Sequence, residues 1–336
     1  MLVRKFSSPQ PLKDIWCKIY QRSKNLSVFQ NYETAELFHK SFHVEKHRWC
    51  FHEVYYYVED GKESLILPLA VDIFHKRVYS LSYYSSLDYY DVIISIHNDD
   101  FLRRALRLVL SLYDGYTFYY RYVNQSSALA RILPPTGSKE ICVSISLEYP
   151  SYKEYYQNLS KHQRQNLRTA YNKLRKENTT FCLKKYSHDH VIDNITYEVC
   201  QQMYENRCDR KNNPRLALLR RRIHRIGNPV YKMVREEADF LIYVLYLNGE
   251  PVAWLGGGIN ASGKSFSIPR LSTSNKWLKY STGIILVNET IKDLMKGGII
   301  TMDLTRGNEP YKYAMGGIEH YNYSGIVKVN KLLEEL

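Results

Sequence analysis

Polar side chains gather near the end of one expected strand in the last third of the chain. Asp303 lies at the end of the apolar segment 299–304, and Arg306, Tyr311 and Lys312 follow in the turn beyond it. Binding and catalytic residues are often carried on loops at the ends of rigid elements, so these four side chains are candidate site residues. The alternative is structural: Asp303 would cap the turn, while Tyr311 and Lys312 would only pack and be solvated.

A second candidate lies between an expected strand, 265–271, and an expected helix that runs to about residue 296. Its residues are Tyr280, Ser281, Thr282 and Gly283. The first N–H groups of a helix have no intrahelical acceptor, and the positive end of the helix dipole lies beside them. This loop is therefore a candidate phosphate site, and the alternative is an ordinary helix N-cap.

A third candidate is a pair of arginines, Arg164 and Arg168, on an expected basic helix at 158–176. Ser160 and Gln163 form a capping-box pattern that starts this helix. The two guanidinium groups lie four residues apart on one side, and bidentate guanidinium groups suit phosphate or carboxylate ligands. They either clamp an anionic ligand or form part of a solvated basic face.

Several other chemistries lack their motifs. His188, Asp189 and His190 lie in a polar segment with no Cys or Glu partner in the sequence, so we expect no metal site. The six cysteines contain no C-x-x-C pair, which argues against zinc and disulfides. The patterns of G-x-S-x-G hydrolases, P-loop NTPases and Rossmann domains are also missing from the sequence.

The elements expected around these candidates alternate between strands and helices. Residues 240–247 form an apolar run that Asn248-Gly249 joins to a second strand, 252–259, and this dipeptide is typical of a tight hairpin. The first half of the chain also mixes strands with helices. We therefore expect an α/β (α+β) protein with two domains, 1–148 and 149–336, divided near a Tyr-Pro-Ser hinge at 149–151.

The net charge of +13 is concentrated in two segments. Residues 153–176 and 207–225 hold seven and eight basic residues, against one acidic residue each. Such a positive field attracts anionic ligands, and it fits nucleic acid, an anionic membrane surface, a phosphorylated sugar carrier or CoA. Neither an apolar run of transmembrane length nor an apolar signal core is present, so we expect a cytoplasmic protein, with peripheral binding at the inner membrane face left open.

The order of the motifs resembles the GNAT acyltransferase superfamily, and in particular its FemAB-like, cellulose-biosynthesis-protein-type branch. The resemblance is carried by the segments 248–253, 279–283, 302–304 and 311–312, and upstream by 152–168. It implies two tandem GNAT-like domains, each a mixed, mostly antiparallel sheet flanked by helices. It also implies an N-acyltransferase that moves an acyl group, with acetyl preferred, from acetyl-CoA or another acyl-CoA to an amine.

The resemblance implies a role for each candidate. Backbone N–H groups at 280–283 would bind the donor pyrophosphate, Asp303 would act as general base, and Tyr311 would protonate the leaving thiolate. The cationic residues would bind the acceptor; these are Arg164, Arg168, Arg306 and Lys312. The acceptor would be a small-molecule or carrier-linked amino sugar, used in envelope polysaccharide synthesis.

Two other functions remain open from the sequence. A FemAB-type enzyme would transfer an aminoacyl group from aminoacyl-tRNA to a peptidoglycan precursor, and this alternative alone brings in nucleic acid. The other possibility is a non-enzymatic protein that binds polyanions through its positive charge. Its affinity for them would fall steeply as the salt concentration rises.

Overall fold

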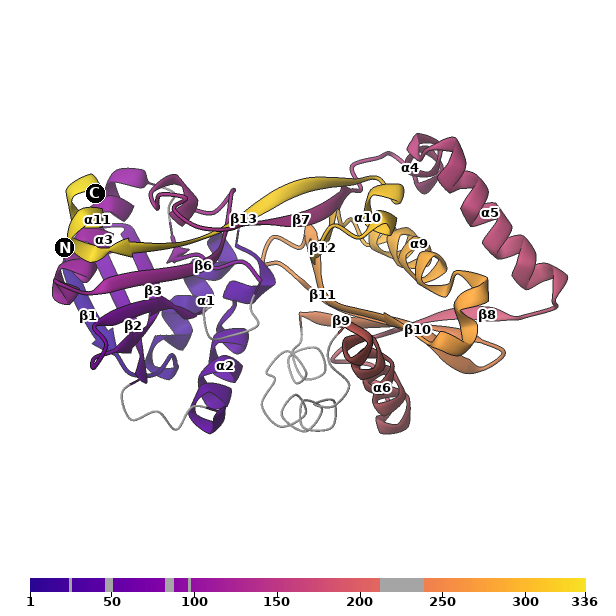
Figure 1. Ribbon diagram of the computed structural model, residues 1–336, viewed down its shortest axis with the longest axis horizontal. Helices are drawn as coiled ribbons and strands as arrows, with labels where there is room; N and C mark the ends of the chain where they lie inside the picture. The colour runs from indigo at the N-terminus through magenta and orange to yellow at the C-terminus, as the bar shows by residue number, and fades with distance from the viewer. Residues whose placement is uncertain (24–25, 46–50, 82–87, 96–97, 212–238) are drawn as a thin grey trace. The chain divides into compact units, whose positions relative to one another are not determined.

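The chain divides into two compact units in the computed structural model, which describes residues 1–336 apart from 24–25, 46–50, 82–87, 96–97 and 212–238 (Figure 1). Unit 1 comprises Met1–Cys142 together with His320–Leu336, and unit 2 comprises Val143–Glu319. The sequence predicted domains 1–148 and 149–336, so the main difference is the C-terminal segment. It groups with unit 1 because its strand pairs with β6 (Thr117–Asn124) and its last helix packs against α3 (Asp99–Leu110).

Unit 1 holds an antiparallel-rich sheet with helices. Its strands are β1 (Leu2–Phe6), β2 (Phe51–Asp60), β3 (Glu63–Asp72), β4 (Arg77–Ser80), β5 (Ile93–Ile94), β6, the start of β7 (Lys139–Ser146) and most of β13 (Gly317–Lys328). Its helices are α1 (Lys13–Arg22), α2 (Tyr32–Glu45), α3 and α11 (Val329–Glu335), with short 3-10 turns at Gln10–Leu12, Val28–Gln30, Ser111–Tyr113 and Leu129–Arg131.

The unit 1 sheet has the order β1-β2-β3-β4-β6-β13, with β5 paired to β3. Neighbours are antiparallel except β4 and β6, which are parallel. Helix α3 covers it with an apolar stripe that includes Phe101, Ala105 and Val109, spaced four residues apart as one face of a helix requires. Val327 and Leu332 from the C-terminal segment complete the same core.

Unit 2 contains the candidate residues of the last third of the chain. Its strands are β8 (Phe181–Tyr186), β9 (Phe240–Leu247), β10 (Glu250–Ile259), β11 (Ser265–Thr273) and β12 (Thr301–Arg306), with the end of β7 and the first residues of β13. Its helices are α4 (Tyr152–Asn158), α5 (Lys161–Lys176), α6 (Asn194–Lys211), α9 (Thr282–Lys296) and α10 (Pro310–Ala314), with a 3-10 turn at Asn275–Tyr280.

The central strand of unit 2 explains why its sequence is apolar throughout. All eight residues of β9 are buried, because α9 and α6 lie on opposite faces of the sheet (Figure 1). The hairpin to β10 turns at Asn248 and Gly249, whose φ angles are 49° and 80°. Both angles are positive, as the expected tight turn requires. The predicted fold class is confirmed: each unit has a mixed, mostly antiparallel sheet flanked by helices.

One irregularity of this sheet prepares the site. β11 and β12 are parallel neighbours, but their ladder is limited to three positions, from Ser265 and Thr301 to Ser267 and Asp303. β11 then continues to Thr273 without β12 as a partner. The end of β11 therefore has no ladder with β12.

Candidate active site

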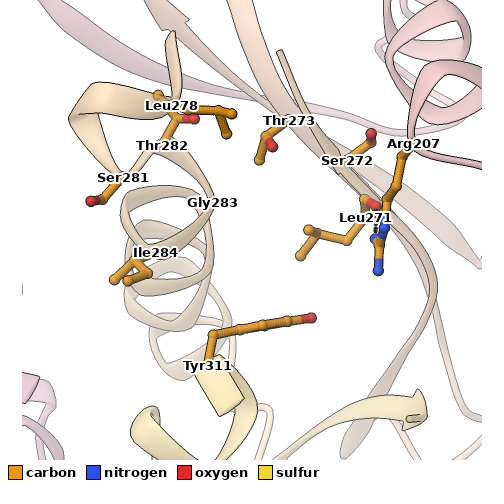
Figure 2. Close-up of a pocket in the computed structure, with 10 residues that line it drawn as sticks. All are labelled: Arg207, Leu271, Ser272, Thr273, Leu278, Ser281, Thr282, Gly283, Ile284 and Tyr311. Atoms are coloured by element: carbon orange, nitrogen blue, oxygen red, sulfur yellow. Dashed lines mark hydrogen bonds between the residues drawn. The ribbon is translucent and has the colours of Figure 1, made fainter. Parts of the chain in front are cut away.

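A hollow of about 340 Å³ lies beside the end of β11, beyond the part of that strand that pairs with β12. Five elements line it: the end of β11, the 3-10 turn Asn275–Tyr280, the start of α9, α10 and α6. The lining residues are Arg207, Leu271, Ser272, Thr273, Leu278, Ser281, Thr282, Gly283, Ile284 and Tyr311 (Figure 2). The volume lies within the range of roughly 300–1,000 Å³ that is typical of small-molecule sites. We call this hollow the donor cleft.

The start of α9 supplies hydrogen-bond donors to the donor cleft. The amides of Ile284 and Ile285 both donate to the Ser281 carbonyl, at 3.0 and 3.2 Å, so the amides of Thr282 and Gly283 precede the first intrahelical bonds. The Thr282 hydroxyl is buried and has no hydrogen-bond partner among the described residues. Unpaired amides and an unpaired hydroxyl at the positive end of a helix form a suitable cradle for an anion.

Tyr311 reaches into the donor cleft from α10. Figure 2 shows its ring extending across the hollow, with the hydroxyl toward the side formed by Leu271 and Arg207. Burial, assisted by the Glu309 carboxylate, raises the pKa of Tyr311 to about 12. The phenol is therefore protonated throughout the physiological range and can act as a proton or hydrogen-bond donor.

Arg207 of α6 is a cleft residue that the sequence did not single out. Its guanidinium donates a hydrogen bond to the carbonyl of Leu271, in the part of β11 that does not pair with β12 (Figure 2). It also forms an ion pair with Glu309 at 3.4 Å. Burial alone would raise the pKa of Glu309, but the Lys312 ammonium and the Arg207 guanidinium outweigh it and keep that pKa below its ordinary value. In the sequence Arg207 was only one of many basic residues in 207–225.

Lys312 requires a correction. Its side chain is 2% exposed, and the ammonium donates to four carbonyls, those of Leu304, Thr305, Arg306 and Gly307, at 2.9–3.2 Å. It also forms an ion pair with Glu309 at 3.2 Å. A cation buried and engaged in this way is not available to an acceptor. We therefore assign Lys312 a structural role, which is to hold the loop after β12.

Asp303 is buried on β12 and does not line the donor cleft. One carboxylate oxygen accepts the Thr305 amide at 2.9 Å, and the other accepts the Ser267 hydroxyl at 3.2 Å. These bonds are the ones expected if Asp303 caps the turn after β12. A role for Asp303 as general base stays a prediction. Arg306 ends β12, where its carbonyl accepts a hydrogen bond from Lys312, and a role for its side chain in acceptor binding also stays a prediction.

The predicted phosphate loop divides into two parts. Ser281, Thr282 and Gly283 line the donor cleft, whereas Tyr280 does not. The Tyr280 ring is buried in the core of unit 2, and its hydroxyl donates to Glu177. Sequence reasoning therefore located the start of the helix correctly, and donor binding by the three lining residues stays a prediction.

The two arginines of α5 have different surroundings. The guanidinium of Arg164 donates to the carbonyls of Gln157 and Leu159, at 2.5 Å each, and so it caps the end of α4. Arg168 is exposed and lines a second hollow, away from the donor cleft. The sequence predicted that Arg164 and Arg168 could clamp one anionic ligand. In the structure neither of them lines the donor cleft, and Arg164 is engaged by the end of α4.

Two further observations bear on the expected partners. In the described part of the chain, no group of three or more His, Cys, Asp and Glu side chains could hold a metal ion, and no helix is both long and apolar enough to cross a membrane. The basic segment 207–225 lies outside the described residues from position 212 onward. Its contribution to ligand binding is therefore not described.

Comparison with protein families identifies the unit that holds the cleft. Residues 161–313 match the family described as an acetyltransferase (GNAT) domain. The chain carries a GNAT domain. This match begins at the first residue of α5 and ends in α10, so it includes the donor cleft. Among curated proteins, no sequence match is found.

Several solved structures have a similar fold over nearly the whole chain. FemX superposes with a TM-score of 0.61 and 9% identity, covering 100% of both chains. A conserved protein from Bacteroides thetaiotaomicron VPI-5482 gives 0.56 and 11%, covering 96% of this chain and 99% of its own. The predicted resemblance to the GNAT superfamily is confirmed by the family match, and FemX shows a similar fold over the whole chain.

A third solved structure of similar fold is a domain of a larger enzyme. The C-terminal domain of a putative lysylphosphatidylglycerol synthetase from Agrobacterium fabrum has a TM-score of 0.55 and 11% identity, covering 97% of this chain and 95% of that chain. At such identities these neighbours establish the fold of this GNAT-containing chain and not its substrates.

Proposed function

We propose that the chain is an N-acyltransferase that binds an acyl-CoA donor in the donor cleft and transfers the acyl group to an amine. The observation that carries the proposal is the junction of three features in one hollow. These are the end of β11 that does not pair with β12, the unpaired donors at the start of α9 and the protonated Tyr311. An amino sugar on a small or carrier-linked molecule remains the preferred acceptor.

The proposed reaction exchanges one acyl bond for another. The amine nitrogen attacks the thioester carbonyl, a C–N bond forms, the C–S bond breaks and the amine loses one proton. The chain would contribute mainly by positioning the reactants and by stabilising the charge that develops. The pyrophosphate of the donor would lie against the amides of Thr282 and Gly283, and the leaving sulfur would accept a hydrogen bond from Tyr311.

Donor binding gives the first test. We expect acetyl-CoA to raise the melting temperature of the wild-type chain, because a ligand at 100 times its Kd stabilises the native state by about 2.7 kcal/mol. Gly283→Glu should abolish this shift, since it brings bulk and negative charge to the cradle, where a Cβ already meets Thr273 at 3.2 Å. Differential scanning fluorimetry measures both results.

Gly283→Ala is the matched control for this test. It adds the same Cβ without the charge, so it should keep most of the acetyl-CoA shift. If the wild-type chain shows no shift at millimolar acetyl-CoA but binds aminoacyl-tRNA, the assignment of the donor is wrong.

Asp303 gives the second test. Asp303→Asn keeps an oxygen that can accept the Thr305 amide, so we expect the chain to fold and kcat to fall by about 10², the low end of the loss of a general base. Ser267→Ala removes only the hydroxyl partner and should change kcat by less than about threefold. A folded Asp303→Asn chain with normal kcat would reduce Asp303 to a cap and move the search for a base to Glu309.

The FemAB-type alternative is favoured by one observation, the high pKa of Tyr311. A phenol with a pKa of about 12 protonates a thiolate poorly, because the pKa of an ordinary thiol is about 8.5. The leaving group of an aminoacyl ester is a sugar alkoxide, which is far more basic than a thiolate and is protonated more readily by such a phenol. With such a donor Tyr311 would act as a true general acid, and Tyr311→Phe would impair ester donors more than thioester donors.

A further inference from the structure

A second hollow lies in unit 2 between α4, α5, α9 and β8, and it shares no lining residue with the donor cleft. Its volume is about 380 Å³, which suits one small molecule. The residues that carry the argument are Arg168, Asn172 and Arg175 of α5, Phe181 of β8, and Glu289 and Lys292 of α9. We call this hollow the α5 pocket.

The wall of the α5 pocket that α9 contributes is already neutral and ordered. The Glu289 carboxylate accepts hydrogen bonds from Lys292, at 2.6 Å, and from the Tyr171 hydroxyl. That hydroxyl in turn accepts a hydrogen bond from Asn288 at 2.8 Å. Because Glu289 and Lys292 balance one another, the uncompensated charge of the pocket comes from the two arginines of α5.

Arg168 and Arg175 are exposed, and neither guanidinium forms an ion pair with any of the described residues. Arg175 donates one hydrogen bond, to the Asn172 side chain at 3.2 Å, which leaves most of its donors unused. Seven residues of helix span about 10.5 Å and two turns, so both side chains rise from the same face of α5. Two guanidinium groups at this spacing suit a ligand with more than one phosphate.

Phe181 adds an apolar platform at the edge of the unit 2 sheet. Its ring is 41% exposed and packs beside Tyr171, with centroids 5.6 Å apart. Among the described residues β8 is the last strand of the sheet on this side. An exposed aromatic ring beside a basic groove is a typical surface for stacking a nucleobase.

We propose that the α5 pocket is a nucleotide site, with the base stacked on Phe181 and a di- or triphosphate held between Arg168 and Arg175. The pocket volume favours a single free nucleotide over a nucleic acid strand. This inference does not rest on the proposed acyl transfer. It also reassigns Arg168, which acts here with Arg175 instead of with Arg164.

Isothermal titration with ADP tests the proposal, and it is carried out on the full chain with Gly283→Glu to remove binding in the donor cleft. ADP binds this chain, and Arg168→Gln or Arg175→Gln weakens binding at least tenfold. Phe181→Ala weakens it about five- to a hundredfold, the range for the loss of base stacking. Pyrophosphate and adenosine, which each lack half of the ligand, bind more weakly than ADP.

Lys161→Gln is the matched control, because Lys161 is an exposed cation of the same helix that does not line the pocket. It changes ADP affinity less than twofold. The proposal is overturned if Lys161→Gln weakens binding as much as Arg168→Gln, if Phe181→Ala has no effect, or if a single-stranded oligonucleotide binds at this site and ADP does not. If Gly283→Glu does not fold, the same substitutions in the wild-type chain give the same comparison.

Discussion

Replacing Tyr311 with phenylalanine is expected to lower kcat with an ester donor by about 10²–10⁴, the usual effect of removing a general acid or base, and to lower it less with a thioester donor. The hydroxyl extends into the donor cleft, and its raised pKa keeps it protonated where the leaving group departs. Donor binding should change little, because the phosphate cradle is on α9. Steady-state kinetics with each class of donor would measure the loss.

Tyr313→Phe provides the matched control for Tyr311→Phe. Tyr313 lies two residues away on the same short helix, and its hydroxyl donates to Glu319 without lining the cleft. Its loss should leave kcat within about twofold. A Tyr311→Phe enzyme as active as Tyr313→Phe would remove Tyr311 from the mechanism.

The pH profile gives an independent measurement of Tyr311. An acid must be protonated to act, so its contribution is complete well below its pKa and is lost as pH rises through it. With a pKa of about 12, Tyr311 should cause no fall in kcat between pH 7 and 10. A decline centred near pH 10 that is absent from Tyr311→Phe would show that its pKa is ordinary.

The second large effect is on stability. Lys312→Met should destabilise unit 2 by about 3–5 kcal/mol, the usual cost of removing one partner of a buried ionic interaction. Four carbonyls of the loop after β12 would lose their donor, and Glu309 would lose the cation that lies 3.2 Å from its carboxylate. Urea denaturation, with hydrogen exchange to assign the transition to unit 2, would measure the change.

Lys276→Met is the control for Lys312→Met. Lys276 forms an ion pair with Glu250 at 2.7 Å, but its side chain is 66% exposed. Exposed pairs contribute only about 0–1 kcal/mol, so this substitution should be mild. Equal effects of the two substitutions would show that the carbonyl cage around Lys312 does not stabilise the loop.

Local signals in the sequence were sufficient for the elements around the donor cleft. The run 240–247 corresponds residue for residue to β9, and the Ser-Thr-Gly loop precedes a helix that ends at Lys296. These features depend on neighbours in the chain: apolar patterning, positive φ at Asn248 and Gly249, and residues that start a helix. A strand followed by a polar loop and a helix can therefore be predicted without a structure.

The remaining features of the site depend on contacts between distant residues. Arg207 is a cleft residue because it reaches the Leu271 carbonyl, 64 positions later, and no local pattern marks that contact. Lys312 and Lys276 are both lysines beside a glutamate, yet one is caged by carbonyls and the other is exposed. Packing between distant residues decides which of the two lysines is buried. The sequence alone did not show which one it would be.

The return of the C-terminal segment to unit 1 has a consequence for biosynthesis. A ribosome releases residues 1–142 long before β13 and α11, and at roughly 5–20 residues per second the delay is on the order of ten to thirty seconds. Throughout that interval β6 lacks β13 as a partner, and the core lacks Val327 and Leu332. Residues 1–142 are made before unit 2 but complete their sheet after it, so unit 1 cannot finish folding until β13 and α11 have been translated.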